Sequence, residues 1–196
     1  MSDLGTIRAA LARPGRPSSD FDLNPDTVLP AGRKLRPAGV LAALMDSADG
    51  LQLLLTKRSS GLKHHPGQIA FPGGKQDEGD DDVIAAALRE AHEEIGLPPA
   101  QVKILGQLPA HETVTGFLVT PVICHVTKPF RIIPEPGEVA EVFSVPLAHV
   151  LDASNFIIEG RRWRGQRRSY YAVPYGPYYI WGATARMLRA WTDQMT

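Results

Sequence analysis

The chain has 196 residues, 43% hydrophobic and 21% charged, which is enough for one domain with a buried core and short for two. Its 21 Lys and Arg residues balance its 21 Asp and Glu residues, and a net charge of zero excludes general attraction to nucleic acid or anionic membrane. The single cysteine, Cys124, excludes an intrachain disulfide, and no apolar run approaches the roughly 20 residues of a membrane span, so we expect a cytoplasmic protein.

Residues 1–35, rich in proline, arginine and alanine, predict an N-terminal arm that carries one short helix over residues 3–12. The rest of the chain is expected to form a single folded domain. Two apolar runs at its start, residues 39–44 and 51–58, flank a polar turn and predict a β-hairpin. Residues 61–74 hold four glycines and two prolines, which favours a loop.

The clearest helix is predicted over residues 82–95, where apolar side chains fall within a stripe roughly 40° wide. These side chains are Ile84, Leu88, Ala91 and Ile95. Three aspartates, Asp80 to Asp82, suit its N-terminus by capping and by the helix dipole, and Gly96 stops it. Further strands are expected over residues 102–108, 117–126, 139–145 and 169–173, and further helices over 146–151 and 183–191. Together these elements indicate a mixed α/β sandwich.

On its other face the same helix carries three glutamates, Glu90, Glu93 and Glu94. They repel one another and lie in the last two turns, where the helix dipole disfavours carboxylates. A solvated acidic face is one interpretation. The other is a site for Mg²⁺ or Mn²⁺, because these cations take clustered oxygen ligands and turn the repulsion into attraction. The preceding glycine-containing loop, Phe71 to Lys75, favours the metal site, since its backbone can approach a ligand closely.

Residues 74–97 resemble the signature sequence of Nudix hydrolases, G-x5-E-x7-R-E-U-x-E-E-x-G-U, in which U is a bulky apolar residue. The match is good from Arg89 to Leu97. It departs in the front half, where Asp81 stands at the usual glutamate position and Gly74 lies one residue too far upstream. This departure is similar to a coenzyme A diphosphatase-like branch of the family. The longer pattern of that branch is matched by Leu54–Ser59, His65–Gly74, Asp77, Asp80 and Ala87–Ala91. Near the C-terminus, Ile180–Leu188 is also similar to that branch.

The resemblance implies an α/β fold for residues 36–196: a Nudix-type α/β/α sandwich with a mixed β-sheet and a loop-helix-loop catalytic motif. It implies metal-dependent hydrolysis of a nucleoside-linked diphosphate, with Mg²⁺ or Mn²⁺ as cofactor. Within the branch, the substrate is coenzyme A or acyl-coenzyme A, cut to 3′,5′-ADP and (acyl-)4′-phosphopantetheine. By the same resemblance Glu90 and Glu94 are metal ligands, and Glu93 is a further ligand or the water-activating base. Arg89 is expected to orient the glutamates by ion pairing.

A further acid is expected from outside the motif. Glu138 is preferred as a ligand or base, because it opens a predicted strand and resembles a Glu-Val pair of the branch; a solvated turn acid is the alternative. Glu112 is a weaker rival. Substrate contacts are expected from basic, polar and glycine residues that flank the motif, namely Lys57, Arg58, Lys63, His65, Gln68, Gly73 and Gly74.

Five arginines lie within residues 161–168. They either bind the 3′-phosphate of coenzyme A, with Trp163 stacked on adenine, or form a solvated hairpin tip. RNA binding through this run is a rival interpretation, but the chain is expected to have no nucleic-acid and no membrane partner, only a small nucleotide substrate. The aromatic residues of segment 170–181 are expected in packing or in a homodimer contact.

Two alternatives to the coenzyme A interpretation stay open. The first is a Nudix hydrolase of another nucleoside diphosphate derivative, such as ADP-ribose, NADH or a dinucleotide. The second is a non-catalytic Nudix-fold binding module, which the intact acids of the motif disfavour.

Overall fold

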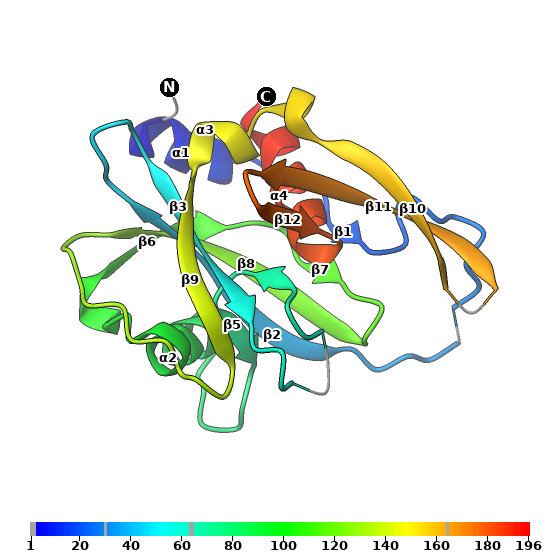
Figure 1. Cartoon of the computed structure of the whole chain (residues 1–196), viewed down its shortest axis with the longest axis horizontal. Helices are drawn as coiled ribbons and strands as arrows, with labels where there is room; N and C mark the ends of the chain where they lie inside the picture. The colour runs from blue at the N-terminus through cyan, green and yellow to red at the C-terminus, as the bar shows by residue number, and fades with distance from the viewer. Residues whose placement is uncertain (1–2, 30, 63–64, 164) are drawn as a thin grey trace.

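The computed structural model describes residues 3–29, 31–62, 65–163 and 165–196, apart from the side chains of Trp163 and Gln166. It has one large sheet, one small sheet, and helices on both sides of the large sheet (Figure 1). The large sheet contains β1 (Ser18–Ser19), β2 (Arg36–Met45), β3 (Gln52–Arg58), β4 (Ile69–Ala70), β5 (Gly73–Lys75), β6 (Val102–Gln107), β7 (His111–Glu112), β8 (Phe117–Val126) and β9 (Val139–Pro146). The small sheet contains β10 (Ile157–Trp163), β11 (Gln166–Tyr175) and β12 (Tyr178–Trp181). The helices are α1 (Leu4–Leu11), α2 (Val83–Ile95), α3 (Leu147–Val150) and α4 (Ala183–Met195), with 3-10 turns at Pro99–Gln101 and Ala153–Asn155.

The large sheet is mixed, as expected. Its strand order is β1-β7-β8-β2-β3-β4, and β5, β6 and β9 pair with β2, β8 and β3. The pairs β2–β8 and β1–β7 are parallel, whereas β2–β3, β3–β9 and β6–β8 are antiparallel. The predicted hairpin is confirmed, because β2 and β3 meet at Leu44–Leu53 and Met45–Gln52 next to the polar turn.

Alternation along β2 and β3 sends side chains into two separate cores, one on each face of the large sheet. The core on the α2 side contains Leu41, Ala43, Leu54, Ala91 and Ile95. The core on the other side contains Leu44, Leu53, Leu55, Ile7 of α1, Trp191 of α4 and Ile180 of the small sheet. Two adjacent strands therefore support both helical layers, and the predicted α/β/α sandwich is confirmed.

The predicted central helix is confirmed as α2, with both of its expected ends. The Asp82 carboxylate accepts hydrogen bonds from the backbone N–H groups of Ile84 and Ala85, at 2.9 and 2.8 Å. The helix ends at Gly96, whose φ of 73° lies in the left-handed region that glycine adopts without strain.

Two details of this helix differ from the prediction. Ile84 and Leu88 of the expected apolar stripe are half-buried, while the small side chains of Ala86 and Ala87 are fully buried. Glu94, expected on the polar face, is buried as well. The cause is the close approach of β2 and β5, which packs the alanine side of the helix against strand backbone.

The segment over residues 61–74 was expected to be mostly loop, and the strand residues that it contains are β4 and the start of β5, which pair with β3 and β2. The strand expected over 169–173 extends to the bounds of β11, and the last helix continues to Met195. Strands β10 and β12 were not predicted. All described side chains of β10 are exposed and β12 has four residues, so neither shows the alternation of a half-buried strand.

The arm forms the predicted short helix as α1, and it packs against the rest of the fold. Ile7 is 0% exposed, and the Arg13 guanidinium donates to the backbone oxygen of Gln194. Further along, Ser18 Oγ lies 2.9 Å from His111 Nδ1, which attaches the arm to β7. The domain boundary at residue 35 stays a prediction. Among the described helices, none is both long enough and apolar enough to cross a membrane.

Candidate active site

Three carboxylates from two distant segments converge at one end of α2. Glu90 and Glu94 lie one helical turn apart, and Glu138 precedes β9. One ligand oxygen from each lies within 4.8 Å of the others. Glu90 is half-buried, Glu94 is buried and Glu138 is exposed, so the cluster runs from the protein interior to solvent. Oxygen ligands in this arrangement suit a hard divalent cation such as Mg²⁺ or Mn²⁺.

Glu94 is the deepest member of the cluster, with 5% of its surface exposed. Burial raises the pKa of its carboxyl group to about 7, and the neighbouring carboxylates of Glu90 and Glu138 act in the same direction. A hydrogen bond of 3.0 Å from the backbone N–H of Gly73 to Glu94 Oε2 opposes this rise, as does the charge of Arg58. The pKa of Glu90 is also raised, mainly by burial. A cation in the cluster would offset this cost of clustering buried acids.

The glycines of β5 explain how a helix carboxylate fits against a strand. A Cβ on Gly74 would lie 2.5 Å from Glu90 Cδ and 2.5 Å from Glu90 Oε1. Gly73 has a φ of 144°, and a Cβ there would lie 2.4 Å from the backbone oxygen of Gly39. The Phe71 to Lys75 loop was expected to bring backbone close to a ligand. It also brings backbone against the proposed metal ligands themselves.

Replacing Gly74 by alanine is expected to displace the Glu90 carboxylate and leave the fold intact. The added methyl group meets the far end of a flexible side chain, which can rotate away at little cost in stability. We expect kcat/KM to fall about tenfold or more through the displaced ligand, with Tm close to that of the parent chain. Steady-state kinetics and thermal unfolding measure the two. A variant that keeps full activity would show that the position of Glu90 against β5 does not matter.

Arg89 connects the carboxylate cluster to the loop before α2. Its Nε and Nη2 atoms lie 3.0 and 2.9 Å from the two carboxylate oxygens of Asp80. Its Nη1 atom lies 3.1 Å from Glu90 Oε1 and 3.1 Å from Glu93 Oε2. The paired guanidinium lowers the pKa of Asp80. The predicted ion pairing of Arg89 with the glutamates is therefore present in the structure.

Asp80 matches the branch pattern, but the sequence analysis did not identify its role. We assigned it to the helix N-terminus with Asp81 and Asp82, but only Asp82 caps the helix, and Asp80 binds Arg89 instead. Counting along the signature placed Asp81 at the acidic position. The inserted residue shifts that position by one, and the spacing of nine residues to Arg89 is the signal that identifies Asp80.

Glu93 and Glu112 lie outside the carboxylate cluster. Glu93 is exposed, and its carboxylate pairs with Arg89. Glu112 lies in β7, where its carboxylate pairs with Arg33 at 2.9 Å. The structure thus groups Glu138 with the motif glutamates and leaves its rival Glu112 elsewhere. The role of Glu93 as ligand or base stays a prediction.

The predicted substrate residues Lys57 and Arg58 lie on β3, His65 and Gln68 lie in the turn before β4, and Gly73 and Gly74 lie on β5. Backbone hydrogen bonds from Arg58 N to Gln68 O and from Gly67 N to Arg58 O, both 3.0 Å, hold the two segments together. Arg58 Nε is buried and has no hydrogen-bond partner among the described residues. Lys57 is exposed beside Arg58, and His65 has a left-handed φ of 54° within the turn. Lys63, expected among the same contacts, lies outside the described residues.

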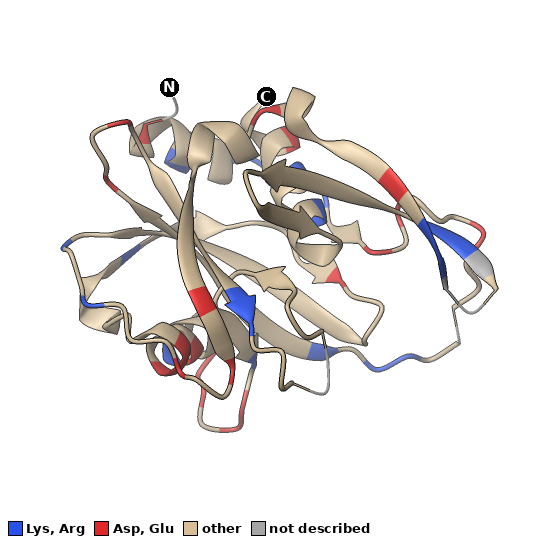
Figure 2. Cartoon of the chain, in the orientation of Figure 1, with Lys and Arg blue, Asp and Glu red and all other residues tan. Residues whose placement is uncertain are grey.

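The arginine-rich run forms the β10–β11 hairpin, as one of its two interpretations predicted. Figure 2 shows acidic residues on α2 and its preceding loop at lower left, and basic residues on this hairpin at the right. Within one chain the hairpin is therefore remote from the carboxylates, which does not favour a contact with the 3′-phosphate of the same substrate. The side chain of Trp163 and all of Arg164 lie outside the described residues.

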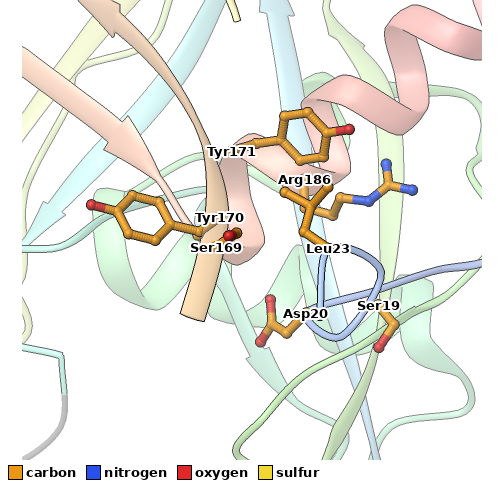
Figure 3. Close-up of a pocket in the computed structure, with 8 residues that line it drawn as sticks. Ser19, Asp20, Leu23, Ser169, Tyr170, Tyr171 and Arg186 are labelled. Carbon is orange, nitrogen blue, oxygen red and sulfur yellow. The ribbon is translucent and has the colours of Figure 1, made fainter. Parts of the chain in front are cut away.

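A small pocket lies where the arm meets β11 and the start of α4 (Figure 3). It is lined by Ser19, Asp20, Leu23, Ser169, Tyr170, Tyr171, Gly182 and Arg186. Its volume of about 20 Å³ is close to that of one water molecule, so it is too small for a nucleotide. Asp22 of the arm and Arg186 of α4 form an ion pair of 2.7 Å beside it. The pocket belongs to the contact that fastens the arm.

Comparison with known proteins identifies the family. Residues 35–163 match the model of the NUDIX domain. A relative from Enterobacter sp. (strain 638), named "Uncharacterized Nudix hydrolase NudL", is 45% identical over 137 residues, which cover 70% of this chain and 71% of the relative. Its namesake from Photorhabdus laumondii is 41% identical over 143 residues, covering 73% and 76%. A crystal structure of a Nudix hydrolase from M. smegmatis, RenU, aligns with 60% of this chain and 73% of that one, at 27% identity and a TM-score of 0.47. This chain belongs to the Nudix family of hydrolases, and it is a Nudix diphosphatase acting on nucleoside diphosphate derivatives.

Proposed function

We propose that the substrate is coenzyme A or acyl-coenzyme A, cut at its diphosphate to 3′,5′-ADP and (acyl-)4′-phosphopantetheine. One observation carries the proposal. The two segments that resemble the coenzyme A diphosphatase-like branch, Leu54–Ser59 and His65–Gly74, pair with each other as β3 and β4. A residue near the C-terminal end of each segment interacts with Glu94. The backbone N–H of Gly73 donates a hydrogen bond to its carboxylate, and the charge of Arg58 acts on it. The branch-specific residues and the family's carboxylates thus share one site.

In this proposal Glu90 and Glu94 hold the cation and Glu138 is a further ligand or the base, since one oxygen from each of the three lies within 4.8 Å of the others. Nudix hydrolases generally use divalent metals such as Mg²⁺ or Mn²⁺. A bound divalent cation neutralises the diphosphate and lowers the pKa of an attacking water. Arg89 positions Glu90 and is itself fixed by Asp80, so the ligand keeps one orientation. Glu138 is the exposed member, placed to accept a proton from water at the solvent side.

Arg58 is the cation we assign to the substrate diphosphate. Its buried Nε has no partner among the described residues, and a guanidinium fork suits phosphate oxygens. Gln68 and His65 border the same turn, and Lys57 lies at its exposed edge. Gly74 leaves room for the Glu90 carboxylate and Gly73 for the backbone of β2, because neither carries a side chain.

A product screen tests the substrate class. The chain is incubated with coenzyme A, acetyl-coenzyme A, ADP-ribose, NADH and a dinucleoside polyphosphate, each with Mg²⁺ or with Mn²⁺. We expect the highest kcat/KM for the coenzyme A compounds, with 3′,5′-ADP as a product detected by mass spectrometry. Faster cleavage of ADP-ribose, NADH or the dinucleotide would overturn the coenzyme A assignment and leave the Nudix chemistry standing. Dephospho-coenzyme A is the matched control, because it lacks the 3′-phosphate and keeps the diphosphate.

A further inference from the structure

Strand β10 lies at the edge of the small sheet, and among the described strands it pairs only with β11. Every side chain from Ile157 to Arg162 is exposed, although successive side chains of a strand point to opposite faces. Two of them are large and apolar, Ile157 and Ile158, with 41% and 59% of their surface exposed. An edge strand leaves alternate N–H and C=O groups without ladder partners, and such an edge is a template for another strand.

Three arginines of the hairpin have no acidic partner among the described residues. Arg161 stands directly opposite Arg168, and Arg162 directly opposite Arg167, which are destabilising like-charge pairs. Across the described ranges, no carboxylate forms an ion pair with Arg161, Arg162 or Arg167. The acid on the strand itself is Glu159, two residues before Arg161 and therefore on the same face. In its own sheet Glu159 stands opposite Tyr170.

The charge pattern of β10 is self-complementary about Gly160. Consider a second copy of β10 that pairs antiparallel with the first, with a two-fold axis at Gly160. Each residue then stands opposite the residue of the other copy that lies equally far from Gly160 on its other side. Glu159 of each copy then faces Arg161 of the other, on the same face of the sheet, twice per interface. Ile158 faces Arg162, whose aliphatic stem can cover it. Gly160, at the axis, adds no side chain to the crossing.

We propose that β10 is a dimer interface, at which a second copy of this chain pairs edge to edge in that register. The two small sheets join into one six-stranded sheet, and each Arg161 obtains a carboxylate partner, which it does not have within the part of its own chain that the structure describes. The contact is isologous, as two-fold pairing of identical strands requires. It lies on the hairpin, remote from the carboxylate cluster in Figure 2, so it does not depend on the identity of the substrate.

Sedimentation equilibrium over a range of chain concentrations tests the register by charge reversal. We expect the parent chain to dimerise, and Glu159→Arg or Arg161→Glu to raise the dissociation constant about tenfold or more, because each turns two opposite-charge contacts into like-charge contacts. The double variant, Glu159→Arg with Arg161→Glu, is expected to restore the dimer. Arg162→Glu is the matched control, with the same change of charge at the neighbouring position but opposite Ile158, and it should weaken the dimer less than Arg161→Glu.

Three results would overturn the proposal. The first is a parent chain that stays monomeric at all concentrations. The second is a dimer that the single reversals leave intact, which would place the contact on another face. The third is equal weakening by Arg161→Glu and Arg162→Glu without rescue by the double variant. A binding assay with a fluorescent RNA oligonucleotide tests the rival partner of the hairpin. If the parent chain is a monomer that binds the RNA, and Arg161→Glu abolishes this binding, the hairpin is a polyanion site and not a dimer interface.

Discussion

Replacing Glu94 by glutamine is expected to lower kcat/KM by about three orders of magnitude. The glutamine amide fills the same space and keeps an oxygen that accepts the 3.0 Å hydrogen bond from Gly73 N–H. The substitution removes the negative charge of Glu94, which is the most deeply buried carboxylate of the cluster. A divalent cation depends most on a charged ligand where few water molecules can solvate it. The measurement is steady-state kinetics at saturating Mg²⁺ or Mn²⁺, together with metal affinity from isothermal titration calorimetry.

The same substitution is expected to stabilise the metal-free chain at neutral and alkaline pH. The pKa of Glu94 is about 7 in the folded state against 4.5 for an ordinary glutamate, so the folded state binds more protons between these values. The free energy of unfolding therefore falls as pH rises from 4.5 through 7, by up to about 3 kcal/mol for a shift of this size. Glutamine does not titrate, so the variant loses this slope. Urea unfolding in EDTA at pH 5 and pH 8 measures it.

Two controls separate the site from general effects of charge. Glu78→Gln removes one negative charge from an exposed position in the same motif and is expected to leave kcat/KM within about twofold. Glu93→Gln tests the open role of the exposed neighbour, and a loss as large as that of Glu94→Gln would make Glu93 a ligand or the base. Full activity in Glu94→Gln, or the parent's pH slope in that variant, would contradict the assignment of Glu94.

The pair Glu90 and Glu94 was predictable because helical spacing alone puts both on one face. Glu138 was preferred from its place at the start of a strand, and the pairing of β9 with β3 brings it to the cluster. The contact of Asp80 with Arg89 was not predicted, because one inserted residue moves the acid relative to the signature and only the folded loop shows which aspartate reaches Arg89. The burial of Glu94 was also hidden. It follows from the close approach of β5, which depends on two glycines and leaves no periodic signal.

The net charge of zero hides a separation between two regions. The acids of α2 and its preceding loop lie at one end of the molecule, and the arginines of the β10–β11 hairpin lie at the other (Figure 2). From the sequence, the arginines had two interpretations, contact with the 3′-phosphate of the same substrate or a solvated hairpin tip. The fold separates the two regions, which does not favour contact of both with one substrate molecule. Sequence distance could not decide this, because the hairpin belongs to a second sheet whose edge strand β10 lacks any pattern of burial.

Gly39→Ala is expected to be the most destabilising single substitution that we predict. Gly39 lies in β2 directly beneath the first turn of α2, and an added Cβ would lie 1.9 Å from the backbone oxygen of Val83. A backbone atom cannot rotate aside as the Glu90 carboxylate can, so the helix must move away from the sheet. We expect the free energy of unfolding to fall by about 3 kcal/mol, near the upper end for overpacking.

Activity should be lost together with stability in this variant, because α2 carries Glu90 and Glu94 and its displacement breaks the contact between Gly73 and Glu94. Urea unfolding and kcat/KM measure the two effects. Gly79→Ala is the control: nothing lies within 4 Å of its added Cβ, and its stability should stay within about 0.5 kcal/mol of the parent. If Gly39→Ala keeps the parent's stability, α2 does not sit as close to β2 as the structure shows. If Gly39→Ala loses stability while Gly74→Ala loses activity alone, the two glycines have different roles. Gly39 then allows α2 to pack closely on β2, and Gly74 allows the Glu90 carboxylate to lie against β5.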